Sequence, residues 1–521
     1  MAYAGAMKIL FVISEVTPFA KTGGLADVGA SLPAALQQLG HDVRLVVPRY
    51  RSVDAARWAL QPTGVETTVE LGPRRHRVTL WEGRLPDTGV PVWFADAPAL
   101  FDRDGLYQTQ GRDYPDNLER FSVFCHAVLQ WLAQSDWRSD VLHAHDWQAA
   151  LACAQAAYGP RRPDSETPLA TVLTVHNLAY QGLFPADQWA LTGLPRRAFT
   201  RRGLEHHGQI SCLKGGLMTA SQLTTVSPTY ADHIQTPEFG CGLDGVVRSR
   251  REALTGILNG IDLRVWDPRT DPLLPARYNA EDLTGKARCK RALQERSGLP
   301  LSADLLIGMV QRVVEQKGLD LLVKALEPLM ALPVQVVLLG TGDPVYERRM
   351  AEAGRRFPGR LAVHLMFDEP FAHLVEAGAD VFLMPSRFEP CGLNQMYSMR
   401  YGTVPIVRRV GGLADTVRDV SPSSVADQTA TGFVFESYAA AAMLESIGRA
   451  VAAYGNRALW GQLMRTGMRQ DFSWERSAKA YEAVYARAQQ EPAAQGFQRR
   501  RWWSHHLRVK AAQRFGSFLQ P

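Results

Sequence analysis

The 521-residue sequence has few cysteines, and no two of them are closely spaced. The six cysteines form no C-x-x-C motif and no compact Cys/His set, which argues against a disulfide-stapled scaffold and a structural zinc site. No apolar run reaches the roughly 18 residues that a membrane-spanning helix needs. The first segment, "MAYAGAMKILFVISE", has one lysine before a short apolar run, which indicates a strand rather than a signal peptide. We therefore expect a cytoplasmic protein.

The body of the chain also carries no excess of positive charge. The formal net charge is +6, and six basic residues without any acidic one lie within residues 492–521. These residues are Arg499, Arg500, Arg501, Arg508, Lys510 and Arg514. The rest of the chain is therefore about neutral, and we expect no nucleic-acid partner.

Short β-branched runs alternate with amphipathic stretches, and this pattern occurs twice. "KILFVISE" and "ATVLTVHN" belong to the first series, and "LLIGMVQR" and "VQVVLLGTGD" to the second. Such runs predict parallel strands covered by helices, which is a doubly wound α/β fold. A Pro- and Asp-rich passage separates the two series. The predicted parts are a Rossmann-like domain (1–263), a linker (264–285), a second Rossmann-like domain (286–470) and a basic aromatic tail (491–521), and we expect the two domains to face each other across a deep cleft.

Ligands of open parallel sheets collect beyond the carboxyl ends of the strands, so the residues there are the candidate site. "KTGGLADV" places Lys21 and a glycine turn before a helix, an arrangement that attracts anions. The alternative is a tight turn capped by Asp27. Arg312 and Lys317 follow a strand of the second series and could neutralise a diphosphate without a metal. For two isolated cations, solvated surface positions are the alternative.

Two further patterns are incomplete. "LLGTGDP" lacks the third glycine of a dinucleotide fingerprint and continues with Pro344, so a dehydrogenase is a poor interpretation. "FDRDG" places Asp102 and Asp104 where they could hold a metal ion, but so short a pattern is common by chance. We expect no metal and no cofactor.

Polar and aromatic groups end two neighbouring strands, in "HAHDWQ" and "TVHNLAYQG". Imidazole, amide, carboxylate and aromatic groups are what a sugar site uses, although each could instead belong to the core. "SRFEPCGLNQ" adds the lone carboxylate Glu389, with Tyr397 eight residues later. A glycoside hydrolase would need two carboxylates. A single carboxylate can hold sugar hydroxyls, while the helix beginning near Leu393 and Asn394 points its amides at phosphate.

Taken together, "KTGGLADV", "HAHDW", "TVHNLAYQG", "SPTYA", "LNGID", "QKGLDLL", "SRFEPCGLNQ" and "GGLADT" resemble the bacterial glycogen synthase and plant starch synthase family over residues 8–485. The resemblance implies the GT-B fold and a helix at 471–490 that crosses back to the N-terminal domain. It also implies transfer of glucose from ADP-glucose to the non-reducing-end 4-hydroxyl of glycogen or another α-1,4-glucan, with retention of configuration, in glycogen biosynthesis.

The resemblance also assigns roles to residues. The catalytic set would be Lys21, His176, Arg312, Lys317 and Glu389. The donor side would add Gly23, Gly24, Asn259, Phe367, Cys391, Gly392, Leu393 and Asn394. The acceptor side would comprise Glu15, Asp27, Asp146, Trp147 and Tyr180. Two positions depart from the family pattern: Gln311 replaces a common Ser, and Phe367 replaces a common Tyr beside the expected adenine. Where some relatives have a second Glu, this chain has Tyr397, as the bacterial synthases generally do.

No residue obviously serves as a nucleophile, so retention favours departure of the diphosphate and entry of the acceptor on the same face. The cations would stabilise the charge that develops on the leaving group. Because they belong to both predicted domains, closure is expected to assemble the site. UDP-glucose as donor and a catalytically silent glucan-binding protein are the alternatives.

Overall fold

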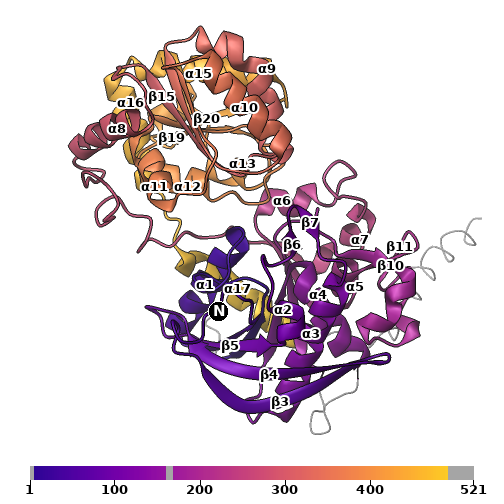
Figure 1. Cartoon of the computed structure of the whole chain (residues 1–521). Coiled ribbons are helices and arrows are strands. Elements are labelled where there is room, and N and C mark those ends of the chain that lie inside the picture. The colour runs from indigo at the N-terminus through magenta and orange to yellow at the C-terminus, as the bar shows by residue number, and fades with distance from the viewer. Residues whose placement is uncertain (1–4, 160–167, 491–521) are drawn as a thin grey trace, which may run out of the picture. The chain divides into compact units, whose positions relative to one another are not determined.

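The computed structural model describes residues 5–159 and 168–490, and the chain divides into two compact units (Figure 1). Of the described residues, unit 1 comprises 5–159, 168–224, Gly245–Leu254 and 481–490, and unit 2 comprises Thr225–Asp244 and Thr255–Ala480. Each unit contains a largely or wholly parallel sheet with helices packed on it, so the α/β prediction is confirmed. The domain boundaries and the cleft stay predictions, and the basic tail lies outside the described residues.

Unit 1 is built on a nine-stranded sheet with the order β14-β13-β9-β8-β1-β2-β5-β4-β3. Its central strands run parallel: β1 (Lys8–Val12), β2 (Asp42–Pro48), β5 (Pro91–Asp96), β8 (Val141–His145) and β9 (Ala170–Val175). These strands are apolar and almost fully buried because helices cover both faces of the sheet. The helices include α1 (Gly24–Gln38), α3 (Asn117–Gln134), α4 (Asp146–Tyr158) and α5 (Cys212–Thr219).

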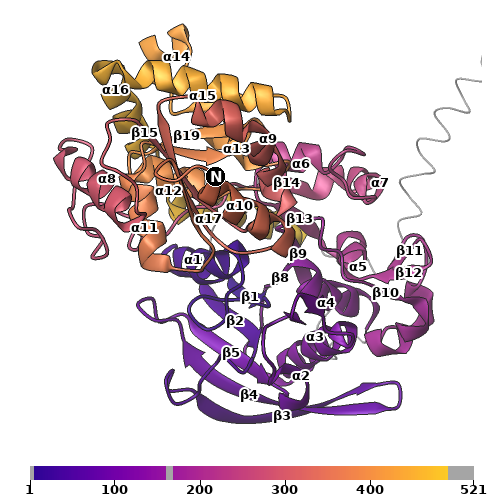
Figure 2. The ribbon, with the colours of Figure 1, turned by 45° about the horizontal axis from the view of Figure 1, so that its top comes forward.

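One edge of this sheet is a long antiparallel hairpin that the sequence did not predict, formed by β3 (Gln61–Leu71) and β4 (Arg74–Arg84) (Figures 1 and 2). The other elements in this part of the chain are β13 (Gln222–Thr225), β14 (Leu254–Gly256), α2 (Pro98–Phe101), β6 (Gln108–Thr109), β7 (Arg112–Asp113), β10 (Leu183–Pro185), β11 (Glu205–His206), β12 (Gln209–Ser211), α7 (Asp244–Ser249) and the 3₁₀ helices η1 (Ala186–Thr192), η2 (Arg196–Ala198) and η3 (Arg251–Ala253).

The last helix, α17 (Trp474–Gln490), packs its second half in unit 1. The Tyr485 hydroxyl hydrogen-bonds Nδ1 of the buried His143 at 2.9 Å, and Glu482 lies 3.0 Å from Nε2 of His41. These contacts join residues more than 300 positions apart, so the end of the described chain contributes side chains to the interior of unit 1.

Unit 2 has a six-stranded, fully parallel sheet with the order β17-β16-β15-β18-β19-β20. Its strands are β15 (Leu305–Val310), β16 (Val334–Leu339), β17 (Leu361–His364), β18 (Val381–Met384), β19 (Val404–Arg408) and β20 (Phe433–Phe435). Its helices are α6 (Pro228–His233), α8 (Thr284–Arg296), η4 (Glu315–Lys317), α9 (Leu319–Met330), α10 (Pro344–Arg356), α11 (Glu369–Gly378), α12 (Asn394–Arg400), α13 (Gly411–Thr416), α14 (Pro422–Ala426), α15 (Ala440–Tyr454) and α16 (Arg457–Met468). The chain reverses its direction across the sheet after β17, which places the ends of β15 and β18 at a switch point.

The predicted linker is anchored on unit 2 by three side chains. Trp266 stacks between His373 and Tyr397, with ring centroids at 4.0 and 3.9 Å. Asp271 lies 2.7 Å from Nδ1 of His373 and accepts a hydrogen bond from the Tyr401 hydroxyl at 2.6 Å. Asp267 pairs with Arg400 at 2.6 Å. This passage is therefore fixed to helices α11 and α12.

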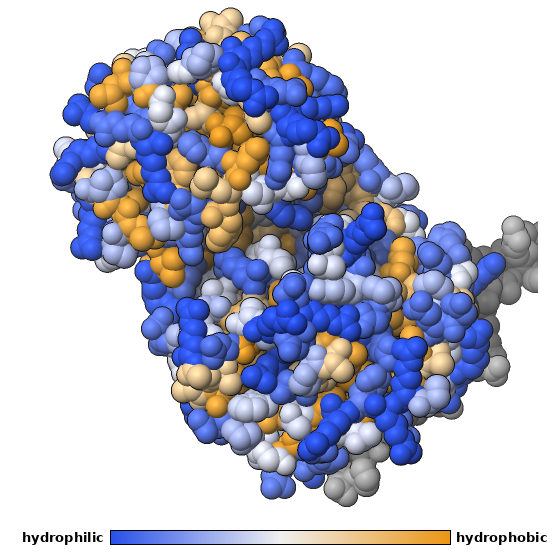
Figure 3. All heavy atoms as spheres, in the orientation of Figure 1, coloured by the Kyte–Doolittle hydropathy of each residue, from blue (hydrophilic) through white to orange (hydrophobic). Residues whose placement is uncertain are grey.

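Hydrophilic side chains cover most of the molecular face in Figure 3, and apolar side chains form small groups on it. The apolar runs of the sequence are instead buried in the two sheets. No helix within residues 5–159 and 168–490 is long and apolar enough to cross a membrane.

Candidate active site

The turn between β18 and α12 holds a buried ion pair in unit 2. The Lys317 ammonium donates to Oε2 of Glu389 at 2.6 Å, and the Ser386 hydroxyl donates to the same oxygen at 3.0 Å. The Glu389 side chain is 6% exposed and that of Lys317 is 17% exposed. Each charge is therefore balanced mainly by the other, and the pair lies beside the end of β18.

Two glycines allow the chain to bring these groups together. Gly318 follows Lys317 with a φ of 76°, and a Cβ at this position would collide with the carbonyl of Pro385. Gly411 has a φ of 48°, and a Cβ there would collide with the carbonyl of Glu389. The left-handed backbone and the short distance to a neighbouring carbonyl both require glycine at these two positions. The glycines therefore let the segments after Lys317 and before α13 pack directly against residues 385–389.

Arg312 follows the carboxyl end of β15, and β15 pairs in parallel with β18, the strand that precedes Glu389. Its Nη2 donates weakly to Oε1 of Gln316 at 3.5 Å, and Nε2 of Gln316 donates to the carbonyl of Phe388 at 3.2 Å. The backbone N–H of Arg387 donates to the carbonyl of Gln316 at 2.8 Å. Gln316 therefore ties the two cations to the Glu389 turn.

The residues after Glu389 are mostly buried. Burial raises the pKa of the Cys391 thiol to about 12, and the backbone N–H of Asn259 contacts this thiol. Oδ1 of Asn259 is buried and finds no hydrogen-bond partner among the described residues, which leaves it available to a ligand. Nδ2 of Asn394 donates to the carbonyl of Val310 at 3.1 Å, so this amide fixes the start of α12 to β15.

Phe367 lies in the loop after β17, and its side chain is 84% exposed. An exposed ring of this size offers a face for stacking with a base. The contact with adenine that the resemblance implies stays a prediction.

In unit 1, His176 and Asp146 lie at the ends of neighbouring strands β9 and β8. The backbone N–H of His176 donates to Oδ1 of Asp146 at 2.7 Å. Burial raises the pKa of Asp146 to about 7, and it lowers the pKa of His176 to about 3. Nδ1 of His145 lies 3.0 Å from Nε2 of His176. His176 is therefore a neutral imidazole whose orientation His145 holds.

The glycine turn after β1 is organised by Glu15. Its carboxylate accepts hydrogen bonds from the backbone N–H groups of Thr22 at 2.5 Å and Gly23 at 3.3 Å, and from the Tyr107 hydroxyl at 2.7 Å. Lys21 pairs with Asp27 at 2.7 Å and is 42% exposed. Two of the amides predicted to attract an anion are thus bonded to Glu15, which leaves the Lys21 ammonium as the accessible positive group of this turn.

The two aromatic residues assigned to the acceptor side differ in environment. Trp147 is buried and packs against Phe121 and Phe184, with ring centroids at 5.1 and 5.8 Å. Tyr180 is 50% exposed. The Trp147 ring is therefore part of the core of unit 1, whereas the Tyr180 ring is accessible to a ligand.

The aspartates of the D-x-D pattern both bind one arginine. Asp102 and Asp104 each lie 2.6 Å from a nitrogen of the Arg51 guanidinium. Among the described residues, no group of three or more His, Cys, Asp or Glu side chains could hold a metal ion. The expectation that no metal takes part stays a prediction.

Sequence reasoning missed three residues that support this site: Tyr107, His145 and Gln316. Each of them supports the site through a contact with a residue that is distant in the sequence. A single sequence predicts neither such contacts nor the direction in which a side chain points. Only a strand-end position, as for His145, could have drawn attention to them.

The two sheets with polar groups at their strand ends fit a two-domain α/β enzyme, and the family models identify its class as a glycosyltransferase. Residues 8–249 match the family model of the starch synthase catalytic domain, and residues 292–463 match that of group 1 glycosyl transferases. The catalytic domain of starch synthase IV from Arabidopsis thaliana, solved with ADP and acarbose, has a TM-score of 0.86 and 33% identity and covers 93% of this chain and 100% of its own. Sucrose-phosphate synthase from Thermosynechococcus elongatus, at 18% identity and a TM-score of 0.57, shares the fold. The GT-B prediction is confirmed.

Curated relatives narrow the assignment from a glycosyltransferase to one family. Glycogen synthase 1 of Methylococcus capsulatus is 50% identical over 489 residues, which cover 92% of this chain and 97% of the relative. The glycogen synthase of Thioalkalivibrio sulfidiphilus is 50% identical over 488 residues, covering 92% and 99%. The chain therefore belongs to the glycogen synthase and starch synthase family.

Proposed function

We propose that this chain is a glycogen synthase, which transfers glucose from ADP-glucose to the non-reducing-end 4-hydroxyl of an α-1,4-glucan with retention of configuration. The observation that carries the proposal is the cluster of Arg312, Lys317 and Glu389 at the ends of β15 and β18. This cluster offers positive charge to a diphosphate and a carboxylate to sugar hydroxyls. The identity to curated glycogen synthases supports the same assignment.

In this proposal the cations act on the leaving group. The guanidinium of Arg312 and the ammonium of Lys317 stabilise the negative charge that develops on the diphosphate as the glycosidic bond breaks. Lys21, whose ammonium is accessible in unit 1, is assigned to the same phosphates. Groups held by their neighbours need less reorganisation during the reaction, and the weak hydrogen bond to Gln316 restricts the Arg312 guanidinium in this way.

Retention is assigned to departure and entry on one face of the sugar. Cys391 is unsuited as a nucleophile, because its buried thiol with a pKa of about 12 supplies almost no thiolate near neutral pH. Glu389 is paired with Lys317 and is assigned to sugar hydroxyls. The acceptor 4-hydroxyl passes its proton to the departing phosphate oxygen.

The neutral imidazole of His176 is assigned to a hydroxyl of the transferred glucose. Because its pKa is about 3, it remains uncharged over the physiological range and can donate or accept a hydrogen bond without placing a cation at the sugar. The unpartnered Oδ1 of Asn259 is assigned to the same sugar. Tyr180 is assigned to the glucan.

The test is release of ADP from ADP-glucose in the presence of glycogen, with elongation followed by incorporation of labelled glucose. Competition between ADP-glucose and UDP-glucose identifies the donor, and Phe367 is the residue assigned to the base. No release with either donor by a folded protein that still binds glycogen would favour the silent glucan-binding alternative. We place the enzyme in the cytoplasm, and the absence of disulfides among its six cysteines is consistent with a reducing compartment.

A further inference from the structure

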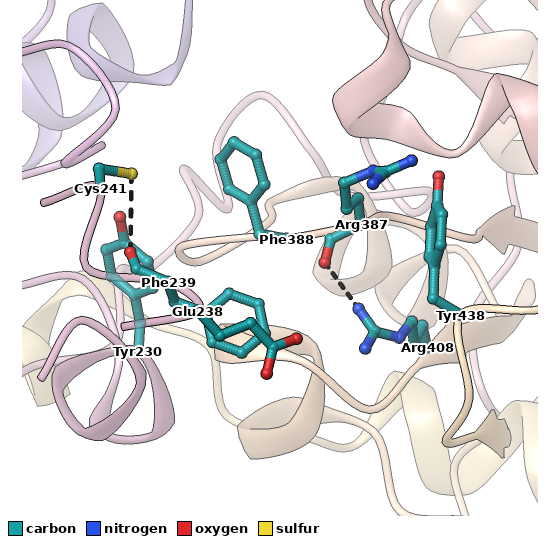
Figure 4. A pocket seen from close by; sticks show the side chains of 8 residues that line it. All are labelled: Tyr230, Glu238, Phe239, Cys241, Arg387, Phe388, Arg408 and Tyr438. Atoms are coloured by element: carbon teal, nitrogen blue, oxygen red, sulfur yellow. Dashed lines mark hydrogen bonds between the residues drawn. The ribbon is translucent and has the colours of Figure 1, made fainter. Parts of the chain in front are cut away.

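Unit 2 contains a pocket that the proposed chemistry does not use. It has a volume of about 320 Å³, and its walls come from α6 and the loop between α6 and α7, the residues before Glu389, the end of β19 and the residues after β20 (Figure 4). The residues that matter here are Glu238, Phe239, Cys241, Phe388, Arg408 and Tyr438. A volume of this size lies at the lower end of the range found for small-molecule sites.

The positive charges of the pocket are already balanced. Arg387 lies 2.9 Å from Glu315, and its guanidinium lies over the Tyr438 ring at 4.5 Å. The Tyr438 hydroxyl donates to Asp320. Arg408 donates to the carbonyl of Arg387 at 2.6 Å. The Arg408 guanidinium faces the Glu238 carboxylate (Figure 4), so each guanidinium of the pocket has an acidic neighbour and the pocket has no excess positive charge that would call for an anion.

Its remaining surface combines aromatic faces with polar groups. The rings of Phe239 and Phe388 belong to the pocket lining, and the Glu238 carboxylate and the Arg408 guanidinium point toward one another (Figure 4). Phe239 stacks on His233 with ring centroids at 4.7 Å, which fixes the orientation of the Phe239 ring. Aromatic faces suit the C–H surfaces of a sugar, while a carboxylate and a guanidinium bind its hydroxyls.

We propose that this pocket binds a segment of an α-1,4-glucan chain other than the end that accepts glucose. A glucan is uncharged, which suits a pocket whose arginines have acidic neighbours. Its sugar rings have apolar faces for the aromatic side chains of the lining, and its hydroxyls can bond to the polar side chains. The inference rests on the proposed function, because that function supplies the glucan as substrate.

The pocket is joined to the donor side through the chain. Phe388 directly precedes Glu389, and its carbonyl accepts from Gln316, the neighbour of Lys317. A glucan segment held here would raise the local concentration of the polymer near the reacting groups. The expected effect is therefore a lower KM for long acceptors, with kcat unchanged.

Cys241 provides a reporter that is independent of activity. It is exposed at the pocket, whereas the other five cysteines are buried. Modification of Cys241 by a thiol reagent at mildly alkaline pH should slow several-fold when maltohexaose is added, and ADP alone should not have this effect. Phe239→Ala should abolish the protection, and Leu301→Ala, at an exposed apolar position outside the pocket lining, should retain it.

Kinetics complete the test. Phe239→Ala should raise the KM for glycogen roughly five- to tenfold and leave kcat with saturating maltotriose unchanged. Unchanged modification of Cys241 at saturating maltohexaose, in wild-type protein that releases ADP normally, would overturn the pocket assignment. Equal protection in Phe239→Ala would also overturn it. Absence of ADP release in the wild type would instead count against the proposed function.

Discussion

Replacing Glu389 by Gln should reveal how much of the stability of unit 2 depends on the Lys317–Glu389 pair. The substitution keeps the side-chain volume but leaves the Lys317 ammonium, 17% exposed, without its carboxylate. Removing one partner of a buried ion pair costs about 3–5 kcal/mol. Because Lys317 retains some contact with water, we expect the lower value, about 3 kcal/mol.

A loss of about 3 kcal/mol should lower the melting temperature of this unit by roughly 6–12 °C, at about 2–4 °C per kcal/mol for a folding unit of 150–250 residues. Lys317→Met should destabilise the unit similarly, because it leaves the carboxylate unpaired. The double variant Lys317→Met/Glu389→Gln should recover at least half of the loss, since it leaves neither charge unpaired.

We expect these substitutions to affect the activity differently from the melting temperature. Each single variant is expected to lose roughly 10²–10³ in kcat, and the double variant should not recover it, because transfer requires the charged groups themselves. Calorimetry and ADP-release kinetics on the same preparations separate the two effects. A melting temperature of Glu389→Gln within a degree of the wild type, or a double variant whose loss equals the sum of the single losses, would refute the reasoning.

Three further predictions concern other groups. Arg312→Ala should lower kcat roughly 10²–10³-fold without changing the melting temperature, because this exposed side chain adds little to the fold; steady-state kinetics and calorimetry check both. Asp146 has a pKa raised to about 7, so the folded state holds a proton that the unfolded chain releases near pH 4, and stability falls as pH rises between these values. Asp146→Asn should therefore melt higher than the wild type at about pH 8 but not at about pH 5. Phe367→Ala should raise the KM for ADP-glucose several-fold and leave the KM for glycogen unchanged, whereas Phe367→Tyr should retain wild-type values.

The parallel sheets could be predicted because their strands are short, apolar and bounded by turn residues. β15, β16 and β18 are buried runs of this kind. The β3–β4 hairpin escaped prediction because its strands are half exposed and contain few apolar residues, so no continuous apolar run marks them in the sequence. Fully buried strands are therefore easier to recognise in this chain than edge strands.

The candidate site was only partly predictable. Strand-end positions singled out Arg312, Lys317 and His176, because strand ends can be inferred from apolar runs. The ion pair of Lys317 with Glu389 joins residues that are 72 positions apart in the sequence, and no local sequence pattern predicts a contact over that separation. The same holds for Glu15, whose carboxylate is bonded to the glycine turn and to Tyr107.

The anchoring of the passage around Trp266 affects how the C-terminal half could be produced as a separate piece. A fragment cut at residue 286 would lack Asp267 and Asp271, so the buried His373 would lose its carboxylate and Arg400 its acid. The Tyr397 ring, which is buried in the whole chain, would also lose the Trp266 indole that stacks on it. A self-standing fragment of the C-terminal half, or a chimera that exchanges this half between relatives, should therefore be joined upstream of Trp266.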